Sequence, residues 1–138
     1  STTSWSVDHS EFRPDLTVIY LGANDFSGWM MPDYKKFNNG YIRLLNEVKA
    51  NYGEEHPILC MTPGPYEFLF TYVRDVVNNC GMKNVYFLGH CPSIHNETDE
   101  DLGAGWHPNY NGQQKIAHAL IPYIATITGW GLQDMPVK

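Results

Sequence analysis

Residues 16–25 read Leu-Thr-Val-Ile-Tyr-Leu-Gly-Ala-Asn-Asp, and they indicate a strand that ends in a polar turn. The first six residues form a near-continuous apolar run, which is typical of a strand buried on both faces of a parallel sheet. Gly22 and Asn24 follow directly. Because functional residues of open α/β sheets gather at the carboxyl ends of the strands, we expect a site at this turn.

The rest of the chain alternates helical and strand-like patterns. Apolar residues recur at helical spacing over 34–52, 66–79 and 111–128, whereas short apolar runs at 57–61 and 84–88 predict strands. The order strand-helix-strand-helix-strand-helix predicts a parallel sheet with right-handed crossovers and helices on both faces. On the last helix, the side chains expected to be buried are Ile116, Ala117, Leu120, Ile121 and Ile124.

Length and composition favour one packed domain. The 138 residues suffice for a single domain, in which we interpret 1–13 as a connecting segment and 129–138 as an irregular tail. An apolar fraction of 43% and an aromatic fraction of 14% favour a globular core. The formal charge of −6 argues against a nucleic-acid partner and an anionic membrane surface. No apolar run is long enough to span a bilayer.

The cysteines do not indicate a metal centre. Cys60, Cys80 and Cys91 permit one disulfide at most and leave an odd thiol. His90 and His95 flank Cys91, but further ligands at a fitting spacing are missing, and the sequence contains no Cys-x-x-Cys pair. We therefore expect neither a metal nor a cofactor.

A second informative stretch, residues 103–114, reads Gly-Ala-Gly-Trp-His-Pro-Asn-Tyr-Asn-Gly-Gln-Gln. Pro108 fixes its own φ and disfavours the helical region for His107. The imidazole is therefore presented from a stiff loop end just before a helix, which suits a catalytic base. The alternative is that His-Pro is a loop dipeptide without a chemical role.

Together, the strand ending in Gly-x-Asn-Asp and the later His-Pro loop resemble the third and fifth sequence blocks of the SGNH (GDSL-like) hydrolases. The resemblance runs from about Pro14 to about Trp130. Residues 24–27 (Asn-Asp-Phe-Ser) and 106–109 (Trp-His-Pro-Asn) are most similar to carbohydrate esterase family 2, whose members remove acetyl groups from sugars. The resemblance implies a flavodoxin-like, three-layer αβα fold with a parallel sheet.

The resemblance also implies roles for four residues in ester hydrolysis. His107 would accept the proton of a serine hydroxyl and return it to the leaving alcohol. The side-chain amide of Asn24 would donate to the developing oxyanion. Trp106 would offer a flat face to a pyranose ring, and Gly22 would belong to the substrate-binding group. Structural alternatives remain open, in which Asn24 is a turn residue and Trp106 anchors the loop to the core.

The family's Gly-Asp-Ser block, which carries the nucleophile, does not occur in this sequence. What is present corresponds to the later three strands of a five-stranded sheet of the order 2-1-3-4-5. We therefore expect an N-terminal segment of the same protein to supply the first two strands and the serine, and the chain to be inactive on its own. The alternative is a half-domain that dimerises through the edge of strand 16–21.

The sequence departs from the family in the group that orients the histidine. An aspartate usually stands two or three residues before it, and these positions are Gly105 and Ala104 here. A serine-histidine dyad is thus expected, with the ring held by a backbone carbonyl or by a carboxylate such as Asp101. Two hypotheses follow: an esterase that deacetylates sugars or polysaccharides, and a catalytically inactive binding or structural subunit.

The cellular location rests on one triplet. Residues 96–98 (Asn-Glu-Thr) form a glycosylation sequon, which has meaning only in a secreted protein. With a carbohydrate ester as the expected substrate, an extracellular protein is favoured.

Overall fold

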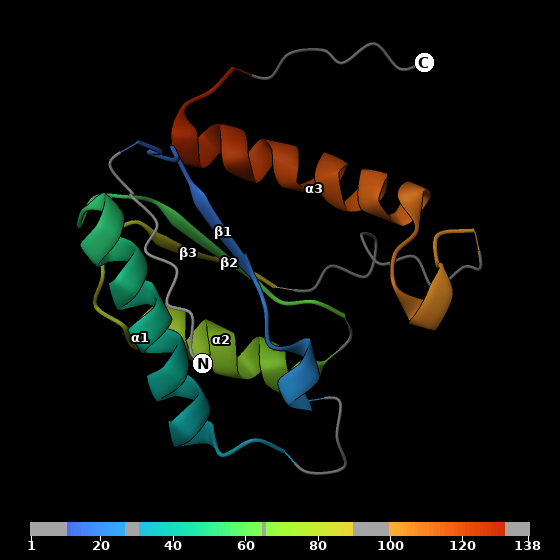
Figure 1. Cartoon of the computed structure of the whole chain (residues 1–138), viewed down its shortest axis with the longest axis horizontal. Helices are drawn as coiled ribbons and strands as arrows, with labels where there is room; N and C mark the ends of the chain where they lie inside the picture. The colour runs from blue at the N-terminus through green and yellow to red at the C-terminus, as the bar shows by residue number, and fades with distance from the viewer. Residues whose placement is uncertain (1–10, 27–30, 65, 90–99, 132–138) are drawn as a thin grey trace.

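The computed structural model describes residues 11–26, 31–64, 66–89 and 100–131. In this part of the chain, three strands alternate with three long helices (Figure 1): β1 (Thr17–Tyr20), α1 (Tyr34–Tyr52), β2 (Ile58–Met61), α2 (Glu67–Asn79), β3 (Val85–Leu88) and α3 (Tyr110–Thr128). Two 3-10 helices precede α1 and α3, namely η1 (Ala23–Phe26) and η2 (Ala104–Trp106). Each predicted strand and helix is present, and its ends differ from the prediction by at most one residue.

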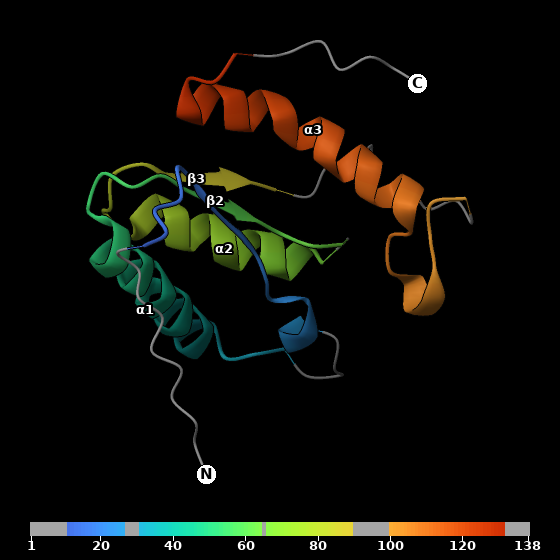
Figure 2. The same cartoon turned by 45° about the horizontal axis from the view of Figure 1, so that its top comes forward.

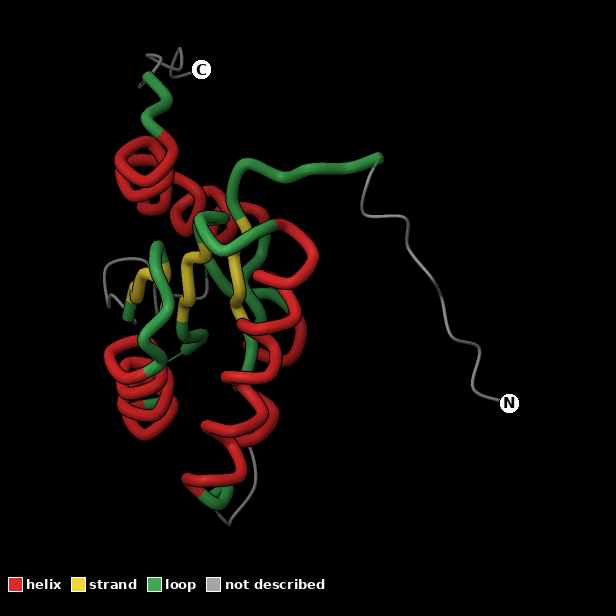
Figure 3. The backbone as a smooth tube through the Cα atoms, turned by 90° about the vertical axis from the view of Figure 1, so that its left-hand side faces the viewer, coloured by secondary structure: helices red, strands yellow, loops and turns green. Residues whose placement is uncertain are grey.

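The strands form a parallel sheet of the order β1-β2-β3, in which Thr17 pairs with Ile58 and Ile58 pairs with Val85. Helices α1 and α2 cover one face of the sheet and α3 covers the other (Figures 1 and 3). The predicted α/β class with three αβα layers is therefore confirmed.

Two apolar clusters hold these layers together. The larger one lies between the sheet and the helices α1 and α2, and its buried members are Ile19, Tyr41, Leu45, Ile58, Cys60, Leu69, Val73 and Val76. The smaller one lies under α3 and is built from Leu59, Met61, Leu88 and Ile116. Strand β2 contributes to both clusters and is buried along its whole length, as a central strand should be.

The prediction that the first strand is buried on both faces is wrong. Ile19 is buried, but Val18 is 40% exposed and Leu21, just beyond β1, is 57% exposed. The cause is the position of β1 at one edge of the sheet formed by the described strands. The fully buried residues beneath α3 come from β2 and β3. On α3, Ala117 and Ile121 are likewise exposed, contrary to expectation.

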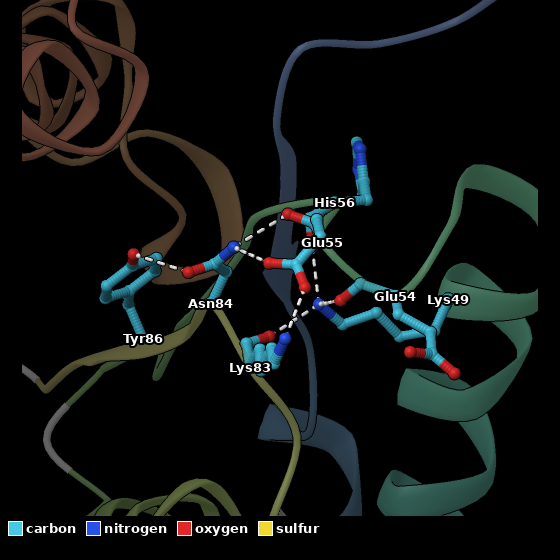
Figure 4. A network of polar contacts seen from close by, with 7 residues as sticks. All are labelled: Lys49, Glu54, Glu55, His56, Lys83, Asn84 and Tyr86. Atoms are coloured by element: carbon cyan, nitrogen blue, oxygen red, sulfur yellow. Dashed lines mark hydrogen bonds and ion pairs between the residues drawn. The ribbon is translucent and has the colours of Figure 1, made fainter.

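The amino-terminal end of the sheet is fastened by a buried lysine (Figure 4). The Lys49 ammonium donates to the carbonyl oxygens of Glu54, His56 and Lys83 at 2.9, 2.6 and 2.6 Å. The hydroxyl of Thr17 lies 2.9 Å from Nε2 of buried His56. These contacts tie the start of all three strands to the end of α1. We therefore infer that the residues at this end of the sheet stabilise the fold.

None of the helices in the described ranges is both long and apolar enough to cross a membrane.

Candidate active site

The two predicted catalytic residues lie at the same end of the sheet. Asn24 is in η1, which follows β1, and His107 follows η2, which precedes α3. Figures 1 and 2 show η1 and η2 on the side toward which the strands run, where the carboxyl ends of the strands lie. The two 3-10 helices stand apart from each other in both views. The structure thus brings Asn24 and His107 to one end of the fold.

Gly22 turns the chain from β1 into η1. Its φ of 109° is a conformation that side-chain-bearing residues rarely adopt. A Cβ at this position would lie 2.6 Å from Cδ1 of Leu69, on α2. The carbonyl of Gly22 accepts a hydrogen bond from the Asp25 N–H at 3.1 Å, which closes the turn. Folding alone therefore explains the glycine, and its substrate-binding role stays a prediction.

An aromatic cluster fixes η1 to the helices beneath it. The Phe26 ring makes edge contacts with Phe37 of α1 at 5.6 Å and with Tyr72 of α2 at 5.2 Å. The Tyr72 hydroxyl donates to the Pro32 carbonyl at 3.2 Å. Such ring pairs add stability beyond their buried area. The turn that exposes Asn24 is consequently anchored to both helices.

His107 sits at the end of a tight hairpin. Its φ of −75° and ψ of 145° are extended, as the following proline predicts. The Gly103 N–H donates to the His107 carbonyl at 2.7 Å, and Leu102 pairs antiparallel with Pro108. Gly105 makes the bend with a φ of 62°. The histidine is exposed.

Sequence reasoning missed Asn109, which joins this hairpin to α3. Its Oδ1 accepts from the backbone N–H groups of Asn111 and Gly112 at 2.9 and 3.2 Å. Its Nδ2 donates to the carbonyls of Glu100 and Leu102 at 2.8 and 3.2 Å. The signal was available in part, because asparagine directly before a helix is a preferred N-cap.

The hairpin also packs closely on the first turn of α3. A Cβ at Gly112 would lie 2.5 Å from the Asp101 carbonyl oxygen and 2.9 Å from Cβ of Pro108. The Asp101 carboxylate is buried and accepts from the Lys115 ammonium at 2.7 Å. Lys115 therefore engages the carboxylate that we considered as an orienter of His107, and that orienting role stays a prediction.

A cavity of about 660 Å³ lies beside the predicted site, between η1 and α1. Gly22 lines it together with exposed Leu21 and Met31, and with Gly40 of α1. A Cβ at Gly40 would meet nothing within 4 Å, so this part of the lining has free space in front of it. The side chain of Trp106, the predicted sugar platform, lies outside the part of the chain that the structure describes.

No set of three or more potential metal ligands gathers among the described residues. The His90, Cys91 and His95 cluster lies outside them, as does the sequon at 96–98. Cys60 and Cys80 are free thiols. Burial raises the pKa of the Cys60 thiol to about 11, so this cysteine is an inert core residue.

Comparison of the sequence with known proteins identifies esterases. No family model matches the sequence. The cellulase/esterase CelE of Acetivibrio thermocellus is 35% identical over 130 residues, which cover 89% of this chain and 16% of that protein. An acetylxylan esterase / glucomannan deacetylase of Cellvibrio japonicus is 24% identical over 127 residues, which cover 89% of this chain and 34% of that protein.

Comparison of the structure agrees. A family two carbohydrate esterase from Clostridium thermocellum, solved in complex with cellohexaose, superimposes with a TM-score of 0.73 and 33% identity. It matches 90% of this chain and 39% of its own. A family two carbohydrate esterase from Cellvibrio japonicus has a TM-score of 0.74 and 22% identity, with 94% and 38% covered, and supports the fold alone. The chain thus spans about two-fifths of these solved structures and less of the curated relatives.

Proposed function

This chain belongs to carbohydrate esterase family 2 over nine-tenths of its length, and on that basis we propose that it forms part of the active site of a serine esterase that removes acetyl groups from sugars or polysaccharides. One observation carries the proposal. The residues that match the family's amide donor and base, Asn24 and His107, both lie at the carboxyl end of the parallel sheet, where such sites are built.

The reaction follows from the chemistry of these two side chains. A serine hydroxyl attacks the acetyl carbonyl while His107 accepts its proton, and the amide of Asn24 donates to the oxyanion that forms. Collapse of this intermediate releases the sugar hydroxyl, which receives the proton from His107. Water then attacks the acetyl-serine with His107 again as base, and acetate leaves. An oxyanion-hole donor of this kind contributes about 3–4 kcal/mol to lowering the barrier.

We infer that the serine comes from outside these residues, and we place its carrier at the β1 edge. Val18 and Leu21 expose apolar surface at or next to the edge strand, which proteins normally cover. We infer that an N-terminal segment of the same protein adds strands beside β1 and brings the serine to the end of the sheet. The substrate is then a carbohydrate ester, and the assembled protein is extracellular.

Complementation tests this assignment. A fluorophosphonate probe labels an activated serine, so it should label the N-terminal segment when that segment is combined with this chain. Neither part should react alone. A mixture that forms a complex but is never labelled would contradict the proposal.

The second candidate is a subunit that keeps the fold without catalysis. Gly105 and Ala104, at the positions of the family's aspartate, favour this candidate. It predicts an acetylated polysaccharide that binds to the assembled protein and is recovered unchanged, with the probe leaving the serine unmodified.

A further inference from the structure

We infer that Asn109 is a positioning residue for His107, because its side-chain amide holds the histidine hairpin against α3. This inference rests on the proposed role of His107 as the base. It concerns a residue two positions further along the chain, which touches neither the substrate nor the reacting atoms.

The contacts of Asn109 span the hairpin. Its Nδ2 donates to the carbonyls of Glu100 and Leu102, in the segment that enters the hairpin. Its backbone N–H donates to the Asp101 carbonyl at 2.8 Å. Its Oδ1 accepts from the first N–H groups of α3. One side chain therefore joins the segment before His107 to the helix after it, across the rigid Pro108.

The two ends of the side chain do different work. Capping needs only an acceptor, and serine, threonine and aspartate provide one as well as asparagine does. Donation to the Glu100 and Leu102 carbonyls needs the amide N–H₂ group, which those three residues lack. Among the common N-cap residues, asparagine alone has an N–H₂ group that can donate to both carbonyls while a separate oxygen caps the helix.

The position of His107 depends on this tie because the residue itself is exposed. Its place is set by the backbone that carries it. A displacement of about 1 Å in a catalytic group can cost about 100-fold in rate. Losing the amide donation should therefore lower kcat clearly while it changes the stability of the fold only slightly.

The test uses the full protein, with the serine-bearing segment present, and the variant Asn109→Ser. This variant keeps the cap acceptor and loses the amide. We expect kcat for acetate release to fall about 10-fold or more, with KM and the midpoint of thermal unfolding nearly unchanged. Asn109→Asp, which keeps an acceptor and has no side-chain donor, should show the same loss of kcat.

The matched control is Asn84→Ser at the amino-terminal end of the sheet. The Asn84 amide donates to the Glu55 carbonyl at 2.8 Å, so this variant loses the same kind of contact. Asn84 directly precedes β3, at the opposite end of the sheet from His107. The variant should be destabilised at least as much as Asn109→Ser, because Asn84 also has a φ of 53°. Its kcat should equal that of the wild type.

A second readout does not depend on turnover. The imidazole Cε1–H resonance of His107 should be single and sharp in the wild type, and broadened or doubled in Asn109→Ser. A wild-type kcat in Asn109→Ser would overturn the inference, and so would a wild-type resonance. His107→Ala distinguishes a failure of the proposed function from a failure of the positioning role. If His107→Ala keeps full turnover, the proposed function is wrong. If His107→Ala is inactive and Asn109→Ser is fully active, only the positioning role is rejected.

Discussion

The N–H of Gly103 donates to the carbonyl of His107 at 2.7 Å, so the loop closes on itself at the histidine. Two residues after the histidine, the backbone N–H of Asn109 donates to the carbonyl of Asp101. Leu102 pairs with Pro108 between these two hydrogen bonds. The proposed base is thus carried by a small antiparallel hairpin rather than by an open loop. Substitutions can therefore change the stability of this hairpin and test its effect on turnover.

Gly112→Ala should loosen the hairpin, because the added Cβ would lie 2.5 Å from the Asp101 carbonyl oxygen. Overpacking of this kind costs about 1–3 kcal/mol, and we expect a lower unfolding midpoint in urea together with lower turnover. The control is Gly40→Ala, where the added Cβ meets nothing within 4 Å. Alanine should raise stability there, by up to about 1 kcal/mol. Equal effects of the two substitutions would contradict the packing seen at Gly112.

Lys49→Met should destabilise the fold by roughly 3 kcal/mol, because three backbone carbonyls lose their shared charged donor. The free energy of unfolding in urea measures the loss. Lys83→Ala is the control, since Lys83 pairs with Glu55 at 2.6 Å on the exposed surface, where ion pairs contribute little. If Lys83→Ala costs as much as Lys49→Met, the amino-terminal end of the sheet is not held as we describe.

Stability should fall as the pH drops below neutrality, partly through His56. Burial, and then the charge of Lys49, hold the pKa of His56 below its usual value. The unfolded chain therefore binds more protons than the folded chain between the usual pKa of about 6.5 and the lowered one. The contribution of His56 is complete above that window and is lost as the pH falls through it.

Urea unfolding at pH 7.5 and at pH 5.5 measures this effect. His56→Gln keeps a partner for the Thr17 hydroxyl and cannot gain a proton, so the difference between the two pH values should shrink. An unchanged difference would show that His56 does not contribute to the pH dependence.

Val18→Lys should leave the isolated chain nearly as stable as before, because Val18 is already 40% exposed. It should block association with the N-terminal segment that we propose. Tyr86→Lys is a closely matched control. Val18 and Tyr86 both pair with Leu59, from opposite edges of the sheet, and Tyr86 is 39% exposed. Sedimentation of each variant with the segment tests the β1 edge. Binding by Val18→Lys at wild-type affinity would contradict its role as the interface.

The fold could be predicted because its signals are local. The periodicity of residues 34–52 gives both ends of α1 correctly, with Asp33 accepting from the Lys36 N–H at its start and Gly53 ending it. Burial was harder to predict. The apolar run at residues 16–21 predicts a strand that is buried on both faces. The structure places β1 at the edge of the described sheet, and the local apolar pattern does not show that position.

At the candidate site, the backbone conformation of His107 was easier to predict than the contacts that support it. Pro108 predicts an extended backbone for His107, and the structure confirms it. The reach of Asn109 to Glu100 and Leu102, nine and seven residues earlier, depends on how the hairpin folds back. The role of Lys49 was missed for a related reason. A lysine on a helix is expected at the surface, and the three carbonyls that accept from Lys49 are brought to it only by the fold.

The rate of acetate release from an acetylated polysaccharide by the full protein, measured with and without His107→Ala, tests the central claim most directly. If His107 is the base, the substitution abolishes turnover while the thermal unfolding midpoint stays close to that of the wild type. Turnover by His107→Ala at the wild-type rate would contradict the account.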